Sequence, residues 1–153
     1  LIPFRWVGPD DLFDVLRSPI HRISVLEVLN RPNVLTLWRQ DGTFMAISSR
    51  MHDVGERLEI GVLSFSLVAR PGAGGVEVDF GAELLRPLRF KKFPVRDSGI
   101  ALDSGIEFEL QNHPTITVVA GVFPCSLAIR GLYEAAHVYE PEYPAERYEV
   151  IYI

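Results

Sequence analysis

The densest group of ionisable side chains in the sequence lies between residues 50 and 59. Guanidinium groups, an imidazole and carboxylates occur there within ten positions, with His52 directly before Asp53 and with Glu56 three positions further on. Imidazole and carboxylate groups can transfer protons when they converge on a substrate. One interpretation is therefore a small enzyme or a small-ligand-binding domain that uses His52, Asp53 and Glu56. The interpretation that we favour is a solvated connection whose opposite charges pair weakly with one another.

The other residues that could do chemistry form no familiar motif. The four histidines lack the i, i+4 spacing of a metal-binding helix. Cys125 is the only cysteine, which excludes zinc sites built on cysteine pairs, and its apolar neighbours predict a buried side chain. The glycine-rich segment 72–75 is followed by a strand pattern and not by a helix, so it predicts a turn and not a phosphate loop. We expect no metal, no cofactor and, under the favoured interpretation, no catalytic residue.

The last 21 residues contain all five tyrosines, interleaved with glutamates. Tyrosine is enriched at protein interfaces because its ring supplies contact area and its hydroxyl a polar tip. An equally compatible interpretation is that these tyrosines line the half-exposed rim of a sheet. The binding residues that we expect are Tyr139, Glu140, Glu142, Tyr143 and Glu146.

Charge is distributed unevenly along the chain, whose net charge is −5. Segment 83–96 carries five basic side chains and one acidic one, whereas segment 97–153 carries two basic and nine acidic ones. An acidic third of this kind suits a basic protein partner and argues against nucleic acid as the main partner. The basic stretch 86–96, with its interleaved phenylalanines, could stack on bases or meet an acidic partner. The simpler interpretation is an exposed strand edge.

Length and hydropathy point to one cytoplasmic domain over residues 1–153. The longest uncharged run, 114–129, contains Gly121 and Pro124 and is shorter than the roughly 20 residues that cross a bilayer. We therefore expect no membrane association, and the lone cysteine fits a reducing compartment. The sequence leaves the oligomeric state open. The expected function is a non-enzymatic protein-binding domain, similar to bacterial immunity and antitoxin proteins in composition only.

The pattern of apolar residues predicts an α+β fold of mainly antiparallel sheet, arranged as hairpins or a meander, curved or sandwich-like, with a short N-terminal helix. The helix is expected over 9–16, and a turn over 31–33. Hairpins are expected from 34–40 with 43–48, from 57–69 with 76–80, and from 106–110 with 115–123, and a closing strand over 148–153. Val118 is expected in a central strand that is buried on both faces. The repeated Asp-Ser-Gly at 97–99 and 103–105 predicts a turn or a bulge at each copy.

Overall fold

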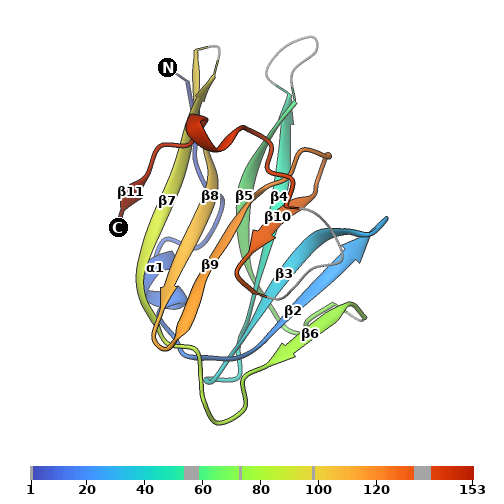
Figure 1. The fold of residues 1–153 in the computed structure, drawn as a ribbon, viewed down its shortest axis with the longest axis vertical. Coiled ribbons are helices and arrows are strands. Elements are labelled where there is room, and N and C mark those ends of the chain that lie inside the picture. Colours follow the sequence, from blue (N-terminus) through green and yellow to red (C-terminus); the bar gives the residue numbers. More distant parts are fainter. Residues whose placement is uncertain (1, 54–58, 73, 98, 133–138) are drawn as a thin grey trace.

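The computed structural model describes residues 2–53, 59–72, 74–97, 99–132 and 139–153, and the strands in these ranges form two facing sheets (Figure 1). The first sheet has the order β5 (Glu59–Val68), β4 (Phe44–Asp53), β3 (Arg31–Arg39), β2 (Ile20–Val28) and β6 (Val76–Asp79). The second has the order β10 (Leu127–Arg130), β9 (His113–Ala120), β8 (Ile100–Leu110), β7 (Pro87–Asp97) and β11 (Ile151–Tyr152), and β1 (Ile2–Phe4) pairs in parallel with β8. The helices in the described residues are α1 (Leu12–Leu16) and the 3-10 turn η1 (Ala145–Arg147). The expected mainly antiparallel fold with a short N-terminal helix is confirmed.

Neither helix of the described ranges is long and apolar enough to cross a membrane.

Strands β2 to β5 form a meander, and the turn between β3 and β4 follows local sequence chemistry. The β3–β4 turn is closed by Asp41, whose carboxylate accepts the backbone N–H of Thr43 at 3.0 Å. Gly42 supplies the positive φ of 85° that this turn requires. The hairpin expected from 34–40 with 43–48 is confirmed, with Val34 opposite Ser48 and Trp38 opposite Phe44.

The hairpin expected from 57–69 with 76–80 is wrong. Strand β6 pairs with β2 at the far edge of the sheet, with Val76 opposite Val25. The physical reason is that part of the outer edge of β5 is already occupied. Phe65 donates its backbone N–H to the carbonyl of Val7 at 2.7 Å, and Val7 donates to Leu63 at 3.1 Å.

Strands β7 to β10 form a second meander, which includes the hairpin expected from 106–110 with 115–123. Its first Asp-Ser-Gly copy lies at the β7–β8 turn, where Gly99 has a φ of 83°; Ser98 is outside the described residues. The second copy lies inside β8, where the register with β7 shifts between Phe93 and Pro94. Proline suits this bulge because it has no N–H to give to the ladder. The expectation of a turn or bulge holds at both copies.

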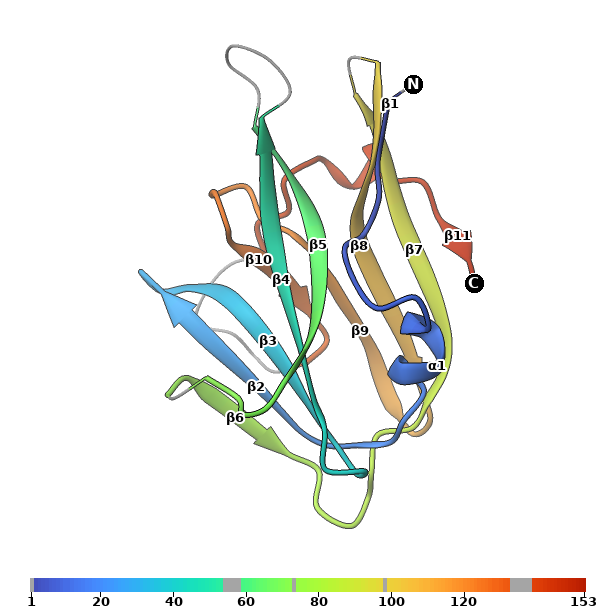
Figure 2. The same cartoon turned by 180° about the vertical axis from the view of Figure 1, so that it is seen from behind.

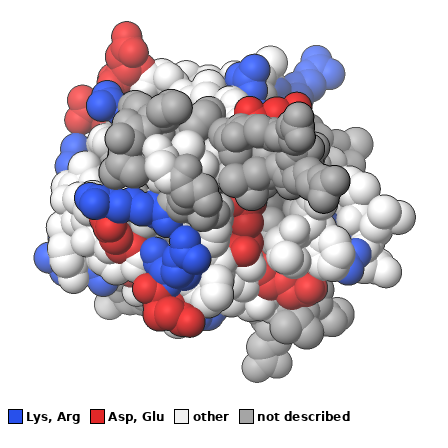
Figure 3. Space-filling model, turned by 90° about the horizontal axis from the view of Figure 1, so that it is seen from above, with Lys and Arg blue, Asp and Glu red and all other residues white. Residues whose placement is uncertain are grey.

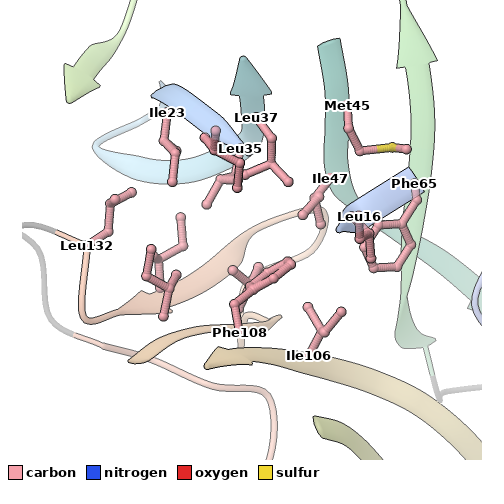
Figure 4. Packing of buried hydrophobic residues seen from close by; sticks show 14 of the residues in the cluster. Leu16, Ile23, Leu35, Leu37, Met45, Ile47, Phe65, Ile106, Phe108 and Leu132 are labelled. Atoms are coloured by element: carbon pink, nitrogen blue, oxygen red, sulfur yellow. The ribbon is translucent and has the colours of Figure 1, made fainter. Parts of the chain in front are cut away.

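A continuous apolar core fills the space between the sheets (Figures 1 and 4). Leu35, Met45 and Ile47 enter it from the first sheet, and Ile106 and Phe108 from the second. Helix α1 adds Leu12 and the fully buried Leu16. The apolar faces of the alternating strands therefore meet each other, as expected for a sandwich.

Both ends of the chain link the two sheets. Residues 2–4 pair with β8, and residue 7 bridges to Ser64 of β5, so the N-terminal segment passes from one sheet to the other (Figure 2). A second apolar cluster lies beside this crossing and includes Ile60, Val62 and Leu102, with Tyr143 and Tyr148 packed against it. Residues 139–153, which we call the C-terminal segment, thus contribute to the core.

Candidate functional site

Glu142, one of the expected binding residues, forms a contact within the chain. Its carboxylate accepts the backbone N–H of Gly61 on the outer edge of β5, at 3.0 Å. A Cβ at position 61 would lie 2.6 Å from Ser49 Oγ and 2.8 Å from the Cβ of Ala120, so the close approach requires glycine. Glu142 donates its own N–H to the carbonyl of Ala120 at 2.9 Å. The residue therefore holds the C-terminal segment between the two sheets.

The expected tyrosines also pack within the domain. Tyr143 donates its backbone N–H to the hydroxyl of Tyr148 at 3.2 Å, and the two ring centroids are 6.2 Å apart. Burial raises the pKa of the Tyr148 hydroxyl to about 12. Tyr139 lies under the guanidinium of Arg130, and burial also raises the pKa of its hydroxyl. These contacts fit the interpretation in which the tyrosines line the half-exposed rim of a sheet.

The charge imbalance along the chain is largely neutralised in space, because basic side chains of β7 face acidic residues of β8 and of the C-terminal segment. The ion pairs are Arg89–Glu109 at 2.7 Å, Lys91–Glu107 at 3.2 Å, Lys92–Asp103 at 2.8 Å and Arg96–Glu149 at 3.1 Å. Of the other expected residues, Glu146 is exposed and Glu140 half-buried. Figure 3 shows acidic and basic side chains interspersed on the end of the molecule that it views. The expected binding residues therefore lie in one segment, and the carboxylate of Glu142 within it is bonded inside the domain.

The 50–59 cluster does not assemble a site among the described residues. His52 and Asp53 are consecutive in β4, opposite Ile60 and Glu59, so their side chains leave opposite faces of the sheet. Glu56 lies outside the described residues. Within the described ranges, no group of three or more His, Cys, Asp or Glu side chains could hold a metal ion.

A different surface combines unusual backbone geometry with exposed apolar side chains. The β2–β3 turn is made by Leu29 and Asn30, whose φ angles are 53° and 62°. Two consecutive positive φ angles are typical of a tight hairpin turn, where Asn-Gly is the preferred pair. Leucine in this region is strained, and the side chain of Leu29 is 84% exposed. The fold gains no packing from it.

The β9–β10 connection lies beside this turn, on the same side of the molecule (Figure 1). Asn33 donates from its amide to the carbonyl of Cys125 at 2.9 Å and so ties the two hairpins together. Cys125 is itself in a left-handed conformation, with a φ of 62°, and is exposed. The expectation that it is buried is wrong, because the tight turn places it outside the core. Val122 and Phe123 are also exposed here, at 51% and 38%.

Arg31 connects the two hairpins through a cation–π contact. Its guanidinium lies 3.4 Å from the ring centroid of Phe123, which is cation–π distance. Its polar contact within the described residues is a long one, 3.5 Å to the carbonyl of Leu29, and its Nε is buried with no hydrogen-bond partner there. We call the set of Val28, Leu29, Arg31, Val122 and Phe123 the hairpin-tip surface. It borders a depression of about 230 Å³.

The hairpin-tip surface consists of exposed apolar side chains and one guanidinium group. Exposed aliphatic side chains gain free energy when a partner removes them from water. A guanidinium on an aromatic ring, with no carboxylate beside it among the described residues, can accept an acidic group in a fork of two hydrogen bonds.

Sequence reasoning missed this surface because it expected the turn at residues 31–33. In the structure Arg31 begins β3, and Pro32 lies opposite Glu27, where the register of β2 and β3 shifts. The shift lets Asn33 turn its side chain toward Cys125. Asn30, which tolerates a positive φ, was the one available signal for the true turn.

In comparisons with known proteins, no family model, no curated protein and no solved structure matches this chain.

Proposed function

We propose that this protein is a non-catalytic domain that binds another protein through the hairpin-tip surface. The observation that carries the proposal is Leu29, a bulky apolar residue in a left-handed turn with its side chain in water. Asn or Gly would fit this turn with less strain. A strained backbone that holds an apolar side chain out in water is typical of functional surfaces.

The chemistry of the surface indicates the chemistry of its partner. Val28, Leu29 and Val122 present aliphatic groups at 50%, 84% and 51% exposure. Arg31 on Phe123 adds a cation and an aromatic ring, the residue types that dominate binding energy at interfaces. The partner that fits is a protein surface with an acidic side chain surrounded by apolar ones.

The basic partner expected from the sequence remains a separate proposal for the acidic C-terminal segment. Glu140 and the exposed Glu146 are the groups that such a partner would meet. Replacing both by glutamine would slow association with a basic partner and flatten its salt dependence. The enzyme alternative based on His52 and Asp53 has the least support, because the two side chains leave opposite faces of β4.

The experiment is affinity capture from the native host with three versions of the purified protein. Leu29→Asn removes the exposed apolar side chain and suits the turn. Leu88→Asn is the matched control, because Leu88 is 63% exposed on β7 and outside the surface. The proposal expects a protein that wild type and Leu88→Asn enrich equally and that Leu29→Asn enriches at least about tenfold less, a loss of roughly 1.4 kcal/mol.

A second variant tests the charge contact. Arg31→Gln removes the cation and keeps a polar side chain of similar length. It is expected to weaken capture of the same protein while the folded fraction stays unchanged. Equal capture by wild type, Leu29→Asn and Arg31→Gln would overturn the proposal.

A further inference from the structure

Independently of the hairpin-tip surface, the outer face of the second sheet carries a row of polar residues, which ends in a cation that forms no ion pair with another described residue. Across the strands, Lys91 is opposite Glu107, Glu107 is opposite Thr117, and Thr117 is opposite Arg130. Lys91 and Glu107 form an ion pair at 3.2 Å, and Thr117 donates its hydroxyl to Glu107 at 3.0 Å. Each interior member of the row therefore has a partner.

Arg130 ends this row on β10. It is exposed, and its guanidinium lies 4.7 Å from the ring centroid of Tyr139. Within the described part of the chain it forms no ion pair, whereas Arg89 and Lys91 of the same face both do. The row therefore ends in a guanidinium that can still bind a carboxylate.

A small pocket opens directly beside Arg130. The C-terminal segment crosses over the second sheet toward β7 (Figure 1). It leaves a space of about 90 Å³ against the sheet. Val119 and Thr117, which are 2% and 4% exposed, line it on the sheet side. Among the described residues, Arg130 is the only charged member of the lining. The remaining members are aromatic or small: Phe93, Tyr139, Pro141, Ala145 and Tyr148.

We infer that this pocket binds a small aliphatic carboxylic acid, with its hydrocarbon part against Phe93, Val119 and Tyr148 and its carboxylate on Arg130. The volume corresponds to about three water molecules in the liquid, which fits an acid of roughly three to five carbons. Burial of a hydrocarbon group against the apolar lining is favourable, and the planar guanidinium suits a planar carboxylate.

Other ligand classes fit this pocket less well. A cationic ligand would be repelled by Arg130, despite the aromatic lining. A phosphate would lose much of its hydration shell against Phe93 and Val119. The pocket offers one guanidinium to compensate for that loss. A drug-sized ligand needs several times this volume.

The test is an NMR titration of the isotope-labelled protein with isobutyrate and with isobutyramide, its neutral analogue of the same shape. Isobutyrate is expected to shift the Arg130 side-chain signal and the Val119 methyl signals, and to bind about tenfold more tightly than isobutyramide. Arg130→Gln should reduce isobutyrate to the affinity of the amide. Arg70→Gln, a change at another exposed arginine, should have no effect.

A further variant tests the position of the site. Ala145 is exposed and lines the pocket, so Ala145→Leu should fill the space and prevent binding of both compounds without unfolding the protein. Equal affinity for isobutyrate and isobutyramide, unchanged binding in Arg130→Gln, or shifts confined to other parts of the protein would each overturn the inference. None of these measurements involves the hairpin-tip surface, so the two proposals succeed or fail separately.

Discussion

The carboxylate of Glu142 accepts the backbone N–H of Gly61 at 3.0 Å and joins segments 81 residues apart in the sequence. Gly61 lies on the outer edge of β5, where Leu63 and Phe65 bond to Val7. Three backbone groups of this edge, the N–H groups of Gly61 and Phe65 and the carbonyl of Leu63, are therefore bonded by Glu142 and Val7. An uncovered edge of this kind would pair with other chains.

Glu142→Ala is expected to lower the free energy of unfolding by about 1–3 kcal/mol, because it leaves the N–H of Gly61 without its acceptor. Glu142→Gln keeps an oxygen at the same place and should recover part of the loss. Urea unfolding followed by circular dichroism measures both. Glu146→Gln, a change at an exposed glutamate in the same segment, is the control and should leave the midpoint in place.

Val118→Asp is expected to prevent folding. Val118 is fully buried in β9 between the sheets, and an unpaired charge there costs several kcal/mol against a total stability of about 5–15 kcal/mol. The same change at Val122, which is 51% exposed just beyond the strand, should leave a folded protein. Solubility and circular dichroism distinguish the two outcomes. A folded Val118→Asp variant would mean that β9 is not a central strand.

Leu29→Asn is expected to raise the free energy of unfolding by about 0.5–1 kcal/mol, since asparagine tolerates the left-handed turn that strains leucine. Thermal unfolding would show this as a higher midpoint temperature. Leu29→Asn is thus expected to raise stability and to lower capture of the partner. This combination distinguishes a binding role of Leu29 from a structural one. A lower midpoint temperature would show that the Leu29 side chain stabilises the fold.

The protein is expected to lose stability as the pH rises from about 10 to about 12. Burial raises the pKa of Tyr148 to about 12, above the value of about 10 for tyrosine in an unfolded chain. The unfolded chain therefore releases this proton first, so the stabilisation is complete below pH 10 and is lost as the pH approaches 12. Urea midpoints between pH 8 and 12 test this.

Tyr148→Phe supplies the comparison for that titration. It removes the ionisable hydroxyl together with the hydrogen bond from Tyr143, so it should be less stable near neutrality and lose less stability above pH 10. Parallel curves for the wild type and Tyr148→Phe would contradict the assignment to Tyr148.

Local pattern predicted which segments are strands better than it predicted which strands pair. The β3–β4 hairpin could be foreseen because Asp41 and Gly42 make its turn within a few residues. The partner of β6 could not, because it depends on the edge of β5 being occupied by Val7, which is far away in the sequence. Pairing across such separations is decided by which edges remain open.

The candidate site was hidden for the same physical reason. The turn at Leu29 breaks the residue preferences by which turns are recognised, and its neighbour Cys125 comes from a hairpin almost a hundred positions later. The uneven distribution of charge was visible in the sequence, but the ion pairs that neutralise it were not. The basic side chains of β7 face Glu107, Glu109 and Asp103 of the adjacent strand. Ion pairs within one sheet therefore neutralise much of the charge imbalance.

The closure of β5 by both ends of the chain also bears on how the protein folds during synthesis. The first sheet emerges from the ribosome well before residue 142, so the N–H of Gly61 has no acceptor from Glu142 while the rest of the chain is being made. Contacts of such long sequence separation slow folding. We expect the last step of folding to follow the emergence of residues 139–153, and the nascent chain to depend until then on chaperones that shield an open strand edge.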